Sequence, residues 1–495
     1  MEKAFKISVI IPVYNVRDYL DECLSSITAQ TIGFSDIQVI LVNDGSPDDS
    51  AAVCRRFAAA HPDNVIYAEQ PNSGVSAARN RGIGLAEGEL ITFLDGDDKW
   101  SAEAFETAYE AYKAHPGVSV FSCRMVFFDG ETGEHQLNYK YEKDRVIDIT
   151  EDYSFPQLSS SSVFITADAI EGHSFTEGLK YSEDFRFINE ILLERPEMML
   201  LRDPVYWYRR RPAGDSAIQK SVSDPDYYVP TCRRVYEYLF DRSRESFGRV
   251  LRYLQFCVMY DLRWRLKIPL AETGLDEETR REYFGLLVGL LKEIDDDIIL
   301  DQKRIALALQ LYALGLKHGR DISERISVDE AGIISYEDRP VFDLTKQPLI
   351  WIDSLRMDDD AFEADGQINF PFNDESFGIR FCLNGVSGEL DAAPSDLNVK
   401  TYPEGVLKSN LTFSLRRPVD YSAGNELYFT VSFSGREFIT APRYTTSTDL
   451  DRKTGELNEK GRTAYRSGHI LCITRRSRAA SFSRRLRRML RSHQK

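Results

Sequence analysis

The sequence has no long apolar runs and no segment that resembles a secretory signal. No stretch of the 495-residue chain approaches the ~18–20 consecutive apolar residues that a membrane-spanning helix needs. Met1–Ile11 also lacks the extended hydrophobic segment on which secretion depends. We therefore expect a cytoplasmic protein, whose contact with a membrane would be peripheral, on its inner face.

Paired cysteines and an excess of basic charge are also missing. The seven cysteines are scattered and form no Cys-x-x-Cys pattern, which indicates reduced thiols rather than a disulfide framework or a zinc site. The net charge is −16 at pH 7, whereas proteins that bind nucleic acid usually carry a basic surface. We therefore expect no nucleic-acid partner.

The length of the chain predicts several domains, because one domain usually has ~100–200 residues. The residue pattern changes near positions 220, 331 and 473. We predict an α/β catalytic domain over 1–220, a helical linker domain over 221–331, an immunoglobulin-like β-sandwich over 332–473 and a basic tail over 474–495.

Short apolar runs alternate with helical patterns in the first 130 residues. The alternation predicts a parallel sheet that is covered by helices on both faces. The expected strands are Ile7–Ile11, Val39–Val42, Val65–Ala68 and Leu90–Leu94, and the expected helices are Val16–Gln30, Ala51–Ala60, Val75–Ala86 and Ala102–Ala114.

The later regions have different periodicities. Tyr253–Leu266 and Tyr283–Ile294 lack strand alternation and predict helices. Short alternating segments with turn residues between or beside them then predict an antiparallel β-sandwich. These segments are Ile379–Leu383, Leu411–Leu415 and Leu427–Phe433, and the turns are Asn384-Gly385 and Ser434-Gly435.

The last 21 residues, Arg475–Lys495, contain eight arginines, one lysine and no acidic residue. On a helix, Phe482, Leu486, Met489 and Leu490 would share one face. A basic amphipathic helix is typical of contact with an anionic membrane surface. A disordered tail, or one that docks on the acidic body of the protein, explains the same composition, and the sequence leaves these alternatives open.

Polar, turn-forming segments follow all four expected strands of the first domain. In parallel α/β sheets ligands bind beyond the carboxyl ends of the strands. One such segment alone is typical of an ordinary turn, but four at one edge indicate a binding site. The segments are Pro12–Asn15, Asn43–Ser46, Pro71–Gly74 and Asp95–Asp98.

The segment Asp95-Gly96-Asp97-Asp98 has three carboxylates in four residues. Their repulsion costs stability unless a cation or hydrogen bonds offset it. Carboxylate oxygens suit Mg²⁺ and Mn²⁺, and Mg²⁺ takes only one or two of them besides water and substrate phosphates. The segment therefore fits a metal–diphosphate clamp. The alternative is an acidic turn before the helix expected at Ala102.

These segments together resemble glycosyltransferase family 2, whose members have the GT-A fold. The matching motifs are SVIIPVYN at Ser8–Asn15, VNDGS at Val42–Ser46, NSGVSAARN at Asn72–Asn80 and FLDGDD at Phe93–Asp98. The resemblance covers about residues 5–220 and extends to Tyr181–Asp184, which is similar to the catalytic Glu-Asp motif of the family, and to Tyr208–Arg211. The pattern around Ser216 matches only in part.

The resemblance implies a role for each matched residue. Pro12, Tyr14 and Asp44 would line the nucleobase pocket, with Asn15 beside them. Asn72 and Arg79 would contact the nucleotide or its phosphates, and Asp95 the ribose. Asp97 would bind Mn²⁺ or Mg²⁺, Asp184 would be the general base, and Glu183 would shape the acceptor site. Arg209, Arg210 and Arg211 would close over the diphosphate or meet an anionic acceptor.

Local alternatives remain for two of these groups. Glu183-Asp184 also suits the first turn of a helix over Phe185–Leu193, and Arg209–Arg211 also suits a solvated strand end. A nucleotidyltransferase would need a glycine-rich basic loop after the first strand, which Pro12–Asn15 lacks. A non-catalytic carbohydrate-binding or assembly protein on the same scaffold is the other alternative.

The resemblance implies a metal-dependent, inverting transferase. Its donor would be a UDP-sugar, and its acceptor a glycan or polyol phosphate of the kind that bacterial teichoic-acid and capsule glycosyltransferases use. In such enzymes an appended β-domain serves oligomerisation or polymer binding, so we expect homo-oligomers through 332–473.

Overall fold

The computed structural model forms two compact units, described here one at a time. The first comprises 1–265 and 270–305, and the second 266–269 and 306–495. The described residues are 4–211, 221–319, 322–347, 349–369, 378–390, 392–394, 400–402, 405–407, 410–420, 425–433, 435–440, 442–444, 456–459, 462–467 and 470–475. Ser216, Ser434 and the predicted amphipathic tail helix lie outside them. The predicted domain boundaries at 220, 331 and 473 stay predictions.

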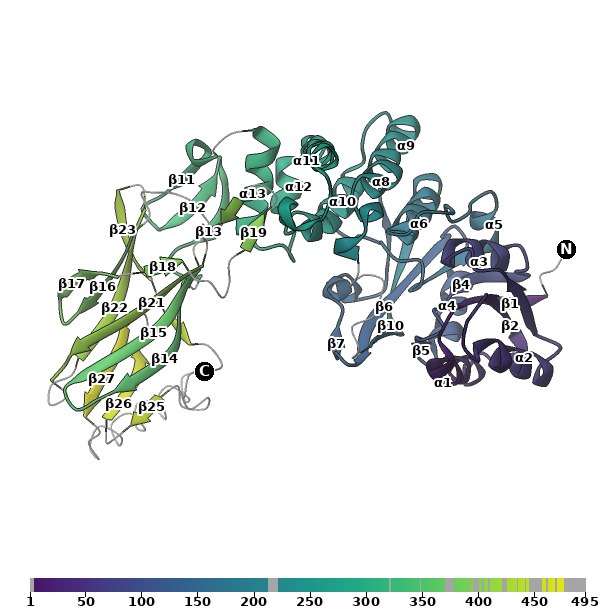
Figure 1. The fold of residues 1–495 in the computed structure, drawn as a ribbon, viewed down its shortest axis with the longest axis horizontal. Coiled ribbons are helices and arrows are strands. Elements are labelled where there is room, and N and C mark those ends of the chain that lie inside the picture. The colour runs from purple at the N-terminus through teal and green to yellow at the C-terminus, as the bar shows by residue number, and fades with distance from the viewer. Residues whose placement is uncertain are drawn as a thin grey trace. The chain divides into compact units, whose positions relative to one another are not determined.

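A ten-stranded sheet forms the centre of the first unit (Figure 1). Its main order is β3-β2-β1-β4-β9-β6-β10-β5, and β7 and β8 pair with β6 and β10. The strands are β1 Phe5–Val13, β2 Ile37–Asp44, β3 Val65–Gln70, β4 Gly88–Phe93, β5 Lys99–Trp100, β6 Val120–Asp129, β7 Gly133–Glu134, β8 Arg145–Asp148, β9 Val163–Thr166 and β10 Glu197–Arg210.

Strand direction brings six strand ends to one edge of this sheet. β1 pairs in parallel with β2 and β4, and β2 with β3, which confirms the four expected parallel strands. β9 is antiparallel to both β4 and β6, so β6 runs in the direction of β4. β10 is parallel to β6. The carboxyl ends of β1–β4, β6 and β10 therefore share an edge, together with the start of β9.

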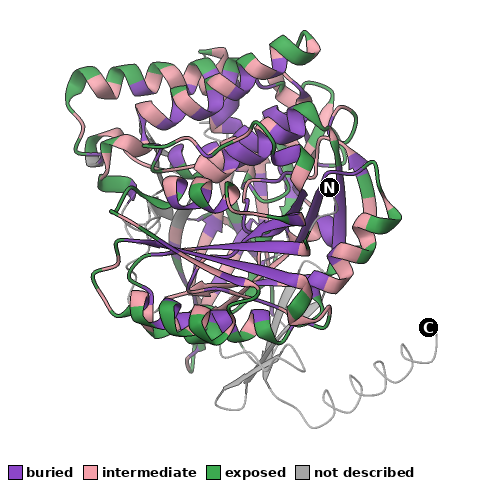
Figure 2. Cartoon of the chain, turned by 90° about the vertical axis from the view of Figure 1, so that its right-hand side faces the viewer, coloured by how far each residue is buried: buried purple, intermediate pink, exposed green. Residues whose placement is uncertain are grey.

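The core explains why these strands form. All eight residues of β2 are buried, and burial along a whole strand is typical of a parallel sheet that is covered on both faces. Figure 2 shows the buried strands between helices that expose only their outer faces. The predicted helices are confirmed within a few residues: α1 Arg17–Thr28, α2 Ser50–Ala60, α3 Val75–Ile83 and α4 Ala104–Ala114. The remaining helices that flank the sheet are α5 Ala167–Ile170 and α6 Glu183–Glu194.

The helical segment belongs to the first unit up to Ile305. Its elements are α8 Val229–Thr231, a π-helical stretch Cys232–Glu237, α9 Tyr238–Phe247, α10 Arg252–Arg265, α11 Glu277–Lys292 and α12 Asp296–Leu300. The predicted helices at Tyr253 and Tyr283 are α10 and α11. Eleven residues of α10 are buried, and a helix buried nearly all round packs inside a protein rather than on its surface.

The second unit begins with α13 Leu307–His318 and is then built of β-strands. A three-stranded sheet, β11-β12-β13, precedes sheets of the orders β18-β21-β15-β14-β24 and β17-β16-β22-β27-β26-β25. The first three strands are β11 Ile326–Val328, β12 Ile333–Tyr336 and β13 Arg339–Asp343. The others include β14 Ile350–Met357, β15 Ala361–Asn369, β16 Gly378–Leu383, β17 Val386–Glu389, β18 Ala392–Pro394, β21 Asn410–Pro418, β22 Asn425–Phe433, β23 Arg436–Thr440, β24 Arg443–Tyr444, β25 Glu456–Glu459, β26 Arg462–Ser467 and β27 Ile470–Arg475.

Packing between the two larger sheets confirms the predicted β-sandwich. The ring of Phe413 on β21 lies 6.1 Å from that of Phe429 on β22, so the sheets contact each other through apolar side chains. The predicted turn at Asn384-Gly385 joins β16 to β17 with φ of 51° and 81°. Positive φ at both residues is what a tight hairpin turn requires.

Two further expectations concern absent features. Among the residues that the structure describes, no helix combines the length and the apolar character that crossing a bilayer requires. Cysteines 23, 54, 123, 232, 257 and 382 are buried and free.

The packing of α3 on β1 gives a stability prediction. A Cβ at Gly82 would lie 2.3 Å from Cγ2 of the buried Ile10, whereas at Gly84 the nearest atom is 3.6 Å away. Overpacking costs about 1–3 kcal/mol and exceeds the helix-propensity gain of up to about 1 kcal/mol. We expect Gly82→Ala to lower the unfolding temperature in calorimetry and Gly84→Ala to leave it unchanged or raise it. Equal unfolding temperatures for the two variants would contradict the tight α3–β1 contact.

Candidate active site

The loops after β2 and β3 meet at the carboxyl edge. Gly45 has φ of 67°, and a Cβ there would lie 2.9 Å from the backbone nitrogen of Asn72. The buried carboxylate of Asp44 accepts hydrogen bonds from the side chain of Gln70 at 2.9 Å and from the backbone N–H groups of Ser73 and Gly74 at 2.9 and 2.8 Å. Asp44 therefore fixes the loop that leads into α3.

The other expected nucleotide-binding residues surround this loop pair. Tyr14 has 48% of its surface exposed, and Asn72 is exposed while Pro12 is partly buried. Asn15 has φ of 55° and donates its N–H to Ser46 Oγ at 3.3 Å. Accessible aromatic and amide groups at this edge are compatible with binding of a nucleobase. The nucleotide-binding role of these residues and of Asp44 stays a prediction.

Arg79 of α3 is the centre of the site. Its side chain is only 3% exposed. Nη2 donates to Asp95 Oδ1 at 2.9 Å, and Nη1 donates to Asp184 Oδ1 at 2.7 Å and to Glu183 Oε1 at 3.2 Å. The sequence predicted contact with the nucleotide for Arg79 and did not predict this contact with three carboxylates. The guanidinium joins α3, the loop after β4 and the start of α6.

The serine loop, Ser159–Ser162, precedes β9 and also donates hydrogen bonds to these carboxylates. Ser160 Oγ donates to Asp184 Oδ1 at 2.6 Å, and Ser161 Oγ donates to Asp95 Oδ2 at 3.4 Å. Sequence reasoning missed both residues. The only local signal is a run of four serines before an apolar segment, and nothing in that run indicates which carboxylates the hydroxyls reach.

The pair Glu183-Asp184 occupies the first turn of α6, as one of the sequence alternatives stated. It also faces Arg79, so its position at a helix start does not exclude a chemical role. Burial, followed by the charge of Asp184, raises the pKa of Glu183 to about 7. Burial also raises the pKa of Asp184, against the opposing effects of Arg79 and Ser160. A carboxylate with a raised pKa is a better proton acceptor near neutral pH.

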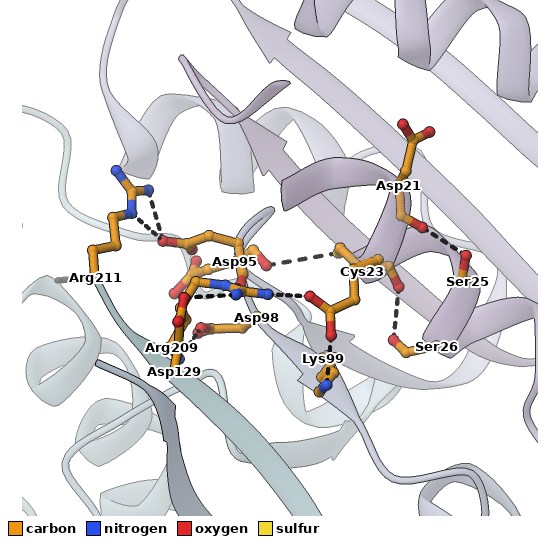
Figure 3. A network of polar contacts seen from close by, with 12 residues as sticks. Asp21, Cys23, Ser25, Ser26, Asp95, Asp98, Lys99, Asp129, Arg209 and Arg211 are labelled. Atoms are coloured by element: carbon orange, nitrogen blue, oxygen red, sulfur yellow. Dashed lines mark hydrogen bonds and ion pairs between the residues drawn. The ribbon is translucent and has the colours of Figure 1, made fainter. Parts of the chain in front are cut away.

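The acidic turn after β4 lies against the end of β10 (Figure 3). Asp97 Oδ2 accepts two hydrogen bonds from Arg211, at 2.9 Å from Nε and 2.6 Å from Nη2. Asp98 is buried and accepts from the Tyr206 hydroxyl and the Arg209 backbone N–H, both at 2.7 Å. Burial, followed by neighbouring carboxylates, raises the pKa of Asp97 and of Asp98.

Arg209 forms a support beside this turn. Its Nε donates to the Asp97 carbonyl oxygen at 2.8 Å, its Nη1 donates to Asp129 at 2.9 Å, and its Nη2 pairs with Glu22. Its guanidinium also lies 4.4 Å from the centre of the Phe128 ring. Only 9% of the side chain is exposed, so the alternative of a solvated strand end is wrong for Arg209. Its contact with a diphosphate stays a prediction.

The implied Mg²⁺ or Mn²⁺ fits this acidic turn. No group of three or more His, Cys, Asp or Glu side chains within the described part of the chain forms a ready-made metal cage. A metal that takes its other ligands from substrate phosphates and water needs only one or two carboxylates. Burial, followed by the charge of Asp95, raises the pKa of Asp97 against the opposing effect of Arg211, and a cation at this carboxyl group would stabilise its charged form.

Residues 8–164 match the family model described as "Glycosyl transferase family 2". The Bacillus subtilis strain 168 "Minor teichoic acid biosynthesis protein GgaA" is 32% identical over 306 residues, which are 60% of this chain and 68% of that protein. The chain belongs to glycosyltransferase family 2. This assignment confirms the family that the four strand-end motifs indicated.

Other relatives of this family 2 chain differ in length from it. The "Minor teichoic acid biosynthesis protein GgaB" of the same strain is 35% identical over 76% of this chain but only 42% of that protein, so the chain spans less than half of its length. The crystal structure of Staphylococcus aureus TarS aligns with 96% of this chain and 86% of that chain at a TM-score of 0.58 and 15% identity. The shared fold confirms the GT-A domain, the helical segment and the C-terminal β-domain.

The Arg79 cluster predicts a large loss of stability when its guanidinium is removed from this family 2 chain. Breaking a buried ion pair costs about 3–5 kcal/mol, because the remaining charges stay buried without compensation. We expect Arg79→Met to lower the free energy of unfolding in urea by about that amount. Arg55→Met removes an exposed ion pair with Glu69 and should change it little. Similar unfolding curves for the two variants would exclude a central role for Arg79.

Proposed function

We propose that the chain transfers a sugar, with inversion, from a UDP-sugar to a hydroxyl of a polyol-phosphate cell-surface polymer. The observation that carries this proposal is the bridge through Arg79 between Asp184 and Asp95. It brings a proton acceptor next to the acidic turn at the donor end of the sheet. The donor class is supported by the similar fold of TarS 1–349 crystallised with UDP-GlcNAc, at a TM-score of 0.51 and 19% identity.

The acceptor class rests on the names of relatives. GgaA and GgaB are minor teichoic acid biosynthesis proteins. TarS, which is 27% identical over 45% of this chain, is a poly(ribitol-phosphate) β-N-acetylglucosaminyltransferase. A polyol-phosphate polymer offers the free hydroxyl groups that a sugar transferase needs, so it is the acceptor class we assign.

In the proposed reaction Asp184 takes the proton of the acceptor hydroxyl. The acceptor oxygen forms a bond to the anomeric carbon as the bond from that carbon to the diphosphate oxygen breaks, and UDP leaves with the bonding electrons. One displacement of this kind inverts the anomeric configuration. A positioned general base contributes ~10²–10⁴-fold to such a step. Glu183, next to Asp184, shapes the acceptor side.

The acidic turn after β4 and the arginines at the end of β10 would offset the charge of the leaving diphosphate. Asp97 would hold Mn²⁺ or Mg²⁺, which when bound would neutralise part of the charge on the diphosphate. Arg211 lies against Asp97 at 2.6 Å and supplies a second positive charge at the same place. Arg209 holds the acidic turn through the Asp97 carbonyl oxygen, which fixes the direction of the Asp97 side chain.

The proposal predicts different defects for two isosteric variants. With UDP-GlcNAc, Mn²⁺ and poly(ribitol phosphate), we expect Asp184→Asn to lower kcat by ~10²–10⁴-fold while UDP binding is unchanged, because the amide cannot accept the proton. Asp97→Asn should abolish transfer and also weaken metal-dependent UDP binding. Released UDP and calorimetric titration measure the two effects.

Asp168→Asn is the matched control, because Asp168 lies in the first turn of α5 and its side chain is 64% exposed. It should retain wild-type turnover. Wild-type turnover in Asp184→Asn would remove that residue from the role of base. Failure of the wild-type chain to release UDP with any sugar nucleotide would favour the non-catalytic carbohydrate-binding alternative.

The buried carboxyl pair also predicts a pH dependence. Asp184 acts only when it is charged, so the rate is lost as the pH falls through its pKa. Because burial raises that pKa, we expect the acid limb of kcat/KM to lie above the ordinary aspartate value of about 3.9. Measurement of kcat/KM between about pH 4 and 8 tests this. A constant value over that whole range would contradict it.

A further inference from the structure

A buried polar network centred on Gln157 adjoins the serine loop. Gln157 is 2% exposed, and both polar atoms of its side chain have partners. Oε1 accepts from Ser122 Oγ at 2.6 Å and from Lys140 Nζ at 2.7 Å, while Nε2 donates to the Ser159 carbonyl oxygen at 2.7 Å. A buried amide with satisfied donor and acceptor has one preferred orientation.

The backbone of Gln157 is held as firmly as its side chain. Its N–H donates to the hydroxyl of Tyr253 on α10 at 3.1 Å, and its carbonyl oxygen accepts from Asn189 Nδ2 on α6 at 3.0 Å. Lys140 also donates to the Pro156 carbonyl oxygen at 2.6 Å. Gln157, two residues before the serine loop, is therefore hydrogen-bonded to β6, α6, α10 and the 3₁₀ helix Gln136–Tyr141.

The serine loop connects this network to the proposed chemistry. Ser160 lies three residues after Gln157, is fully buried, and donates to Asp184 Oδ1 at 2.6 Å. Ser161 follows it and reaches Asp95. Since Gln157 fixes the Ser159 carbonyl, it fixes the peptide from which the Ser160 hydroxyl extends. A shift of about 1 Å at a catalytic group can cost up to about 100-fold in rate.

We infer that Gln157 is a positioning residue for Asp184, which it orients through the serine loop and the hydroxyl of Ser160. This inference rests on the proposed function, because it takes Asp184 as the base. In this role Gln157, which is 2% exposed, acts on Asp184 through Ser160 and not by direct contact with a substrate. Its role is to preserve the hydrogen bond from Ser160 to the Asp184 carboxylate. That bond keeps the orientation and the basicity of the carboxylate that takes the proton of the acceptor.

A positioning role of Gln157 predicts a changed pH dependence of kcat/KM in addition to a lower rate. Hydrogen bonding to the charged form of a carboxylate lowers its pKa, so loss of the Ser160 bond raises the pKa of Asp184. The acid limb of kcat/KM then moves to higher pH, because the base is lost earlier as the pH falls. The charged groups around Asp184 are Arg79, Glu183 and Asp95, and all of them stay in place in the variants below.

The experiment compares Gln157→Met, Ser160→Ala and the double variant in the full-length chain. We expect the two single variants to shift the acid limb upward by similar amounts and to lower kcat by up to about 100-fold, with the donor KM unchanged. The double variant should show no further shift, because both substitutions remove the same hydrogen bond.

Gln38→Met is the matched control. Gln38 is also buried, accepts from Ser8 Oγ at 2.5 Å and from the Glu87 N–H at 2.8 Å, and donates to the Leu85 carbonyl oxygen at 3.0 Å. Its contacts lie between β1, β2 and the segment before β4, away from the carboxylates. It should lower the unfolding temperature as Gln157→Met does but leave the acid limb where it is.

An acid limb at the wild-type position in Gln157→Met, or additive shifts in the double variant, would overturn the inference. If Gln157→Met does not fold, Tyr253→Phe removes the hydroxyl that accepts from the Gln157 N–H and keeps the ring, and the same shift is expected. A wild-type chain that transfers no sugar, or one in which Asp184→Asn is fully active, would overturn the proposed function and not the geometry of the network.

Discussion

The buried guanidinium of Arg79 is the interaction on which the site depends. Asp95 comes from the loop after β4, and Glu183 and Asp184 come from the start of α6, more than 80 residues later in the sequence. Three carboxyl groups in one buried place repel each other. Arg79 reverses that repulsion by contacting all three. The sheet edge proposed to bind the donor and the helix that carries the proposed base are thus joined through one cation.

The helical segment takes part in this arrangement and does not merely follow the α/β domain in sequence. Its helix α10 contacts Gln157, which precedes the serine loop, and Ser182, which precedes Glu183. Tyr253 accepts from the backbone of Gln157, and Asp261 Oδ2 accepts from Ser182 Oγ at 3.5 Å and from Arg265 at 3.1 Å. Ser182 has φ of 61° and immediately precedes Glu183. Through this hydrogen bond to Ser182, α10 helps to position the start of α6.

The sequence predicted the parts of the site that follow from local pattern, and it failed for those that depend on distant partners. Apolar runs and turn-forming segments located the edge of the sheet, because burial and turn chemistry are local properties. The partners of Arg79 are up to 105 residues away, and those of Asp98 are about as distant. Periodicity carries no information on such contacts, and the run of four serines does not indicate which carboxylates its hydroxyls reach.

The charge balance of the edge gives a physical reason for a cation in the proposed reaction. Among the residues that the structure describes, two arginines pair with the carboxylates of this edge: Arg79 with Asp95, Glu183 and Asp184, and Arg211 with Asp97. Asp98 accepts instead from the Tyr206 hydroxyl and a backbone N–H. Arg209 is largely engaged with Glu22 and Asp129. A diphosphate brings further negative charge to this edge, and Coulomb repulsion in a partly buried site is stronger than in water. Burial, followed by the charge of neighbouring carboxylates, raises the pKa of Asp97 and of Asp98. A divalent ion held through Asp97 would offset the negative charge of both the carboxylates and the diphosphate. The single positive charge of Arg211 against Asp97 is too small to offset both.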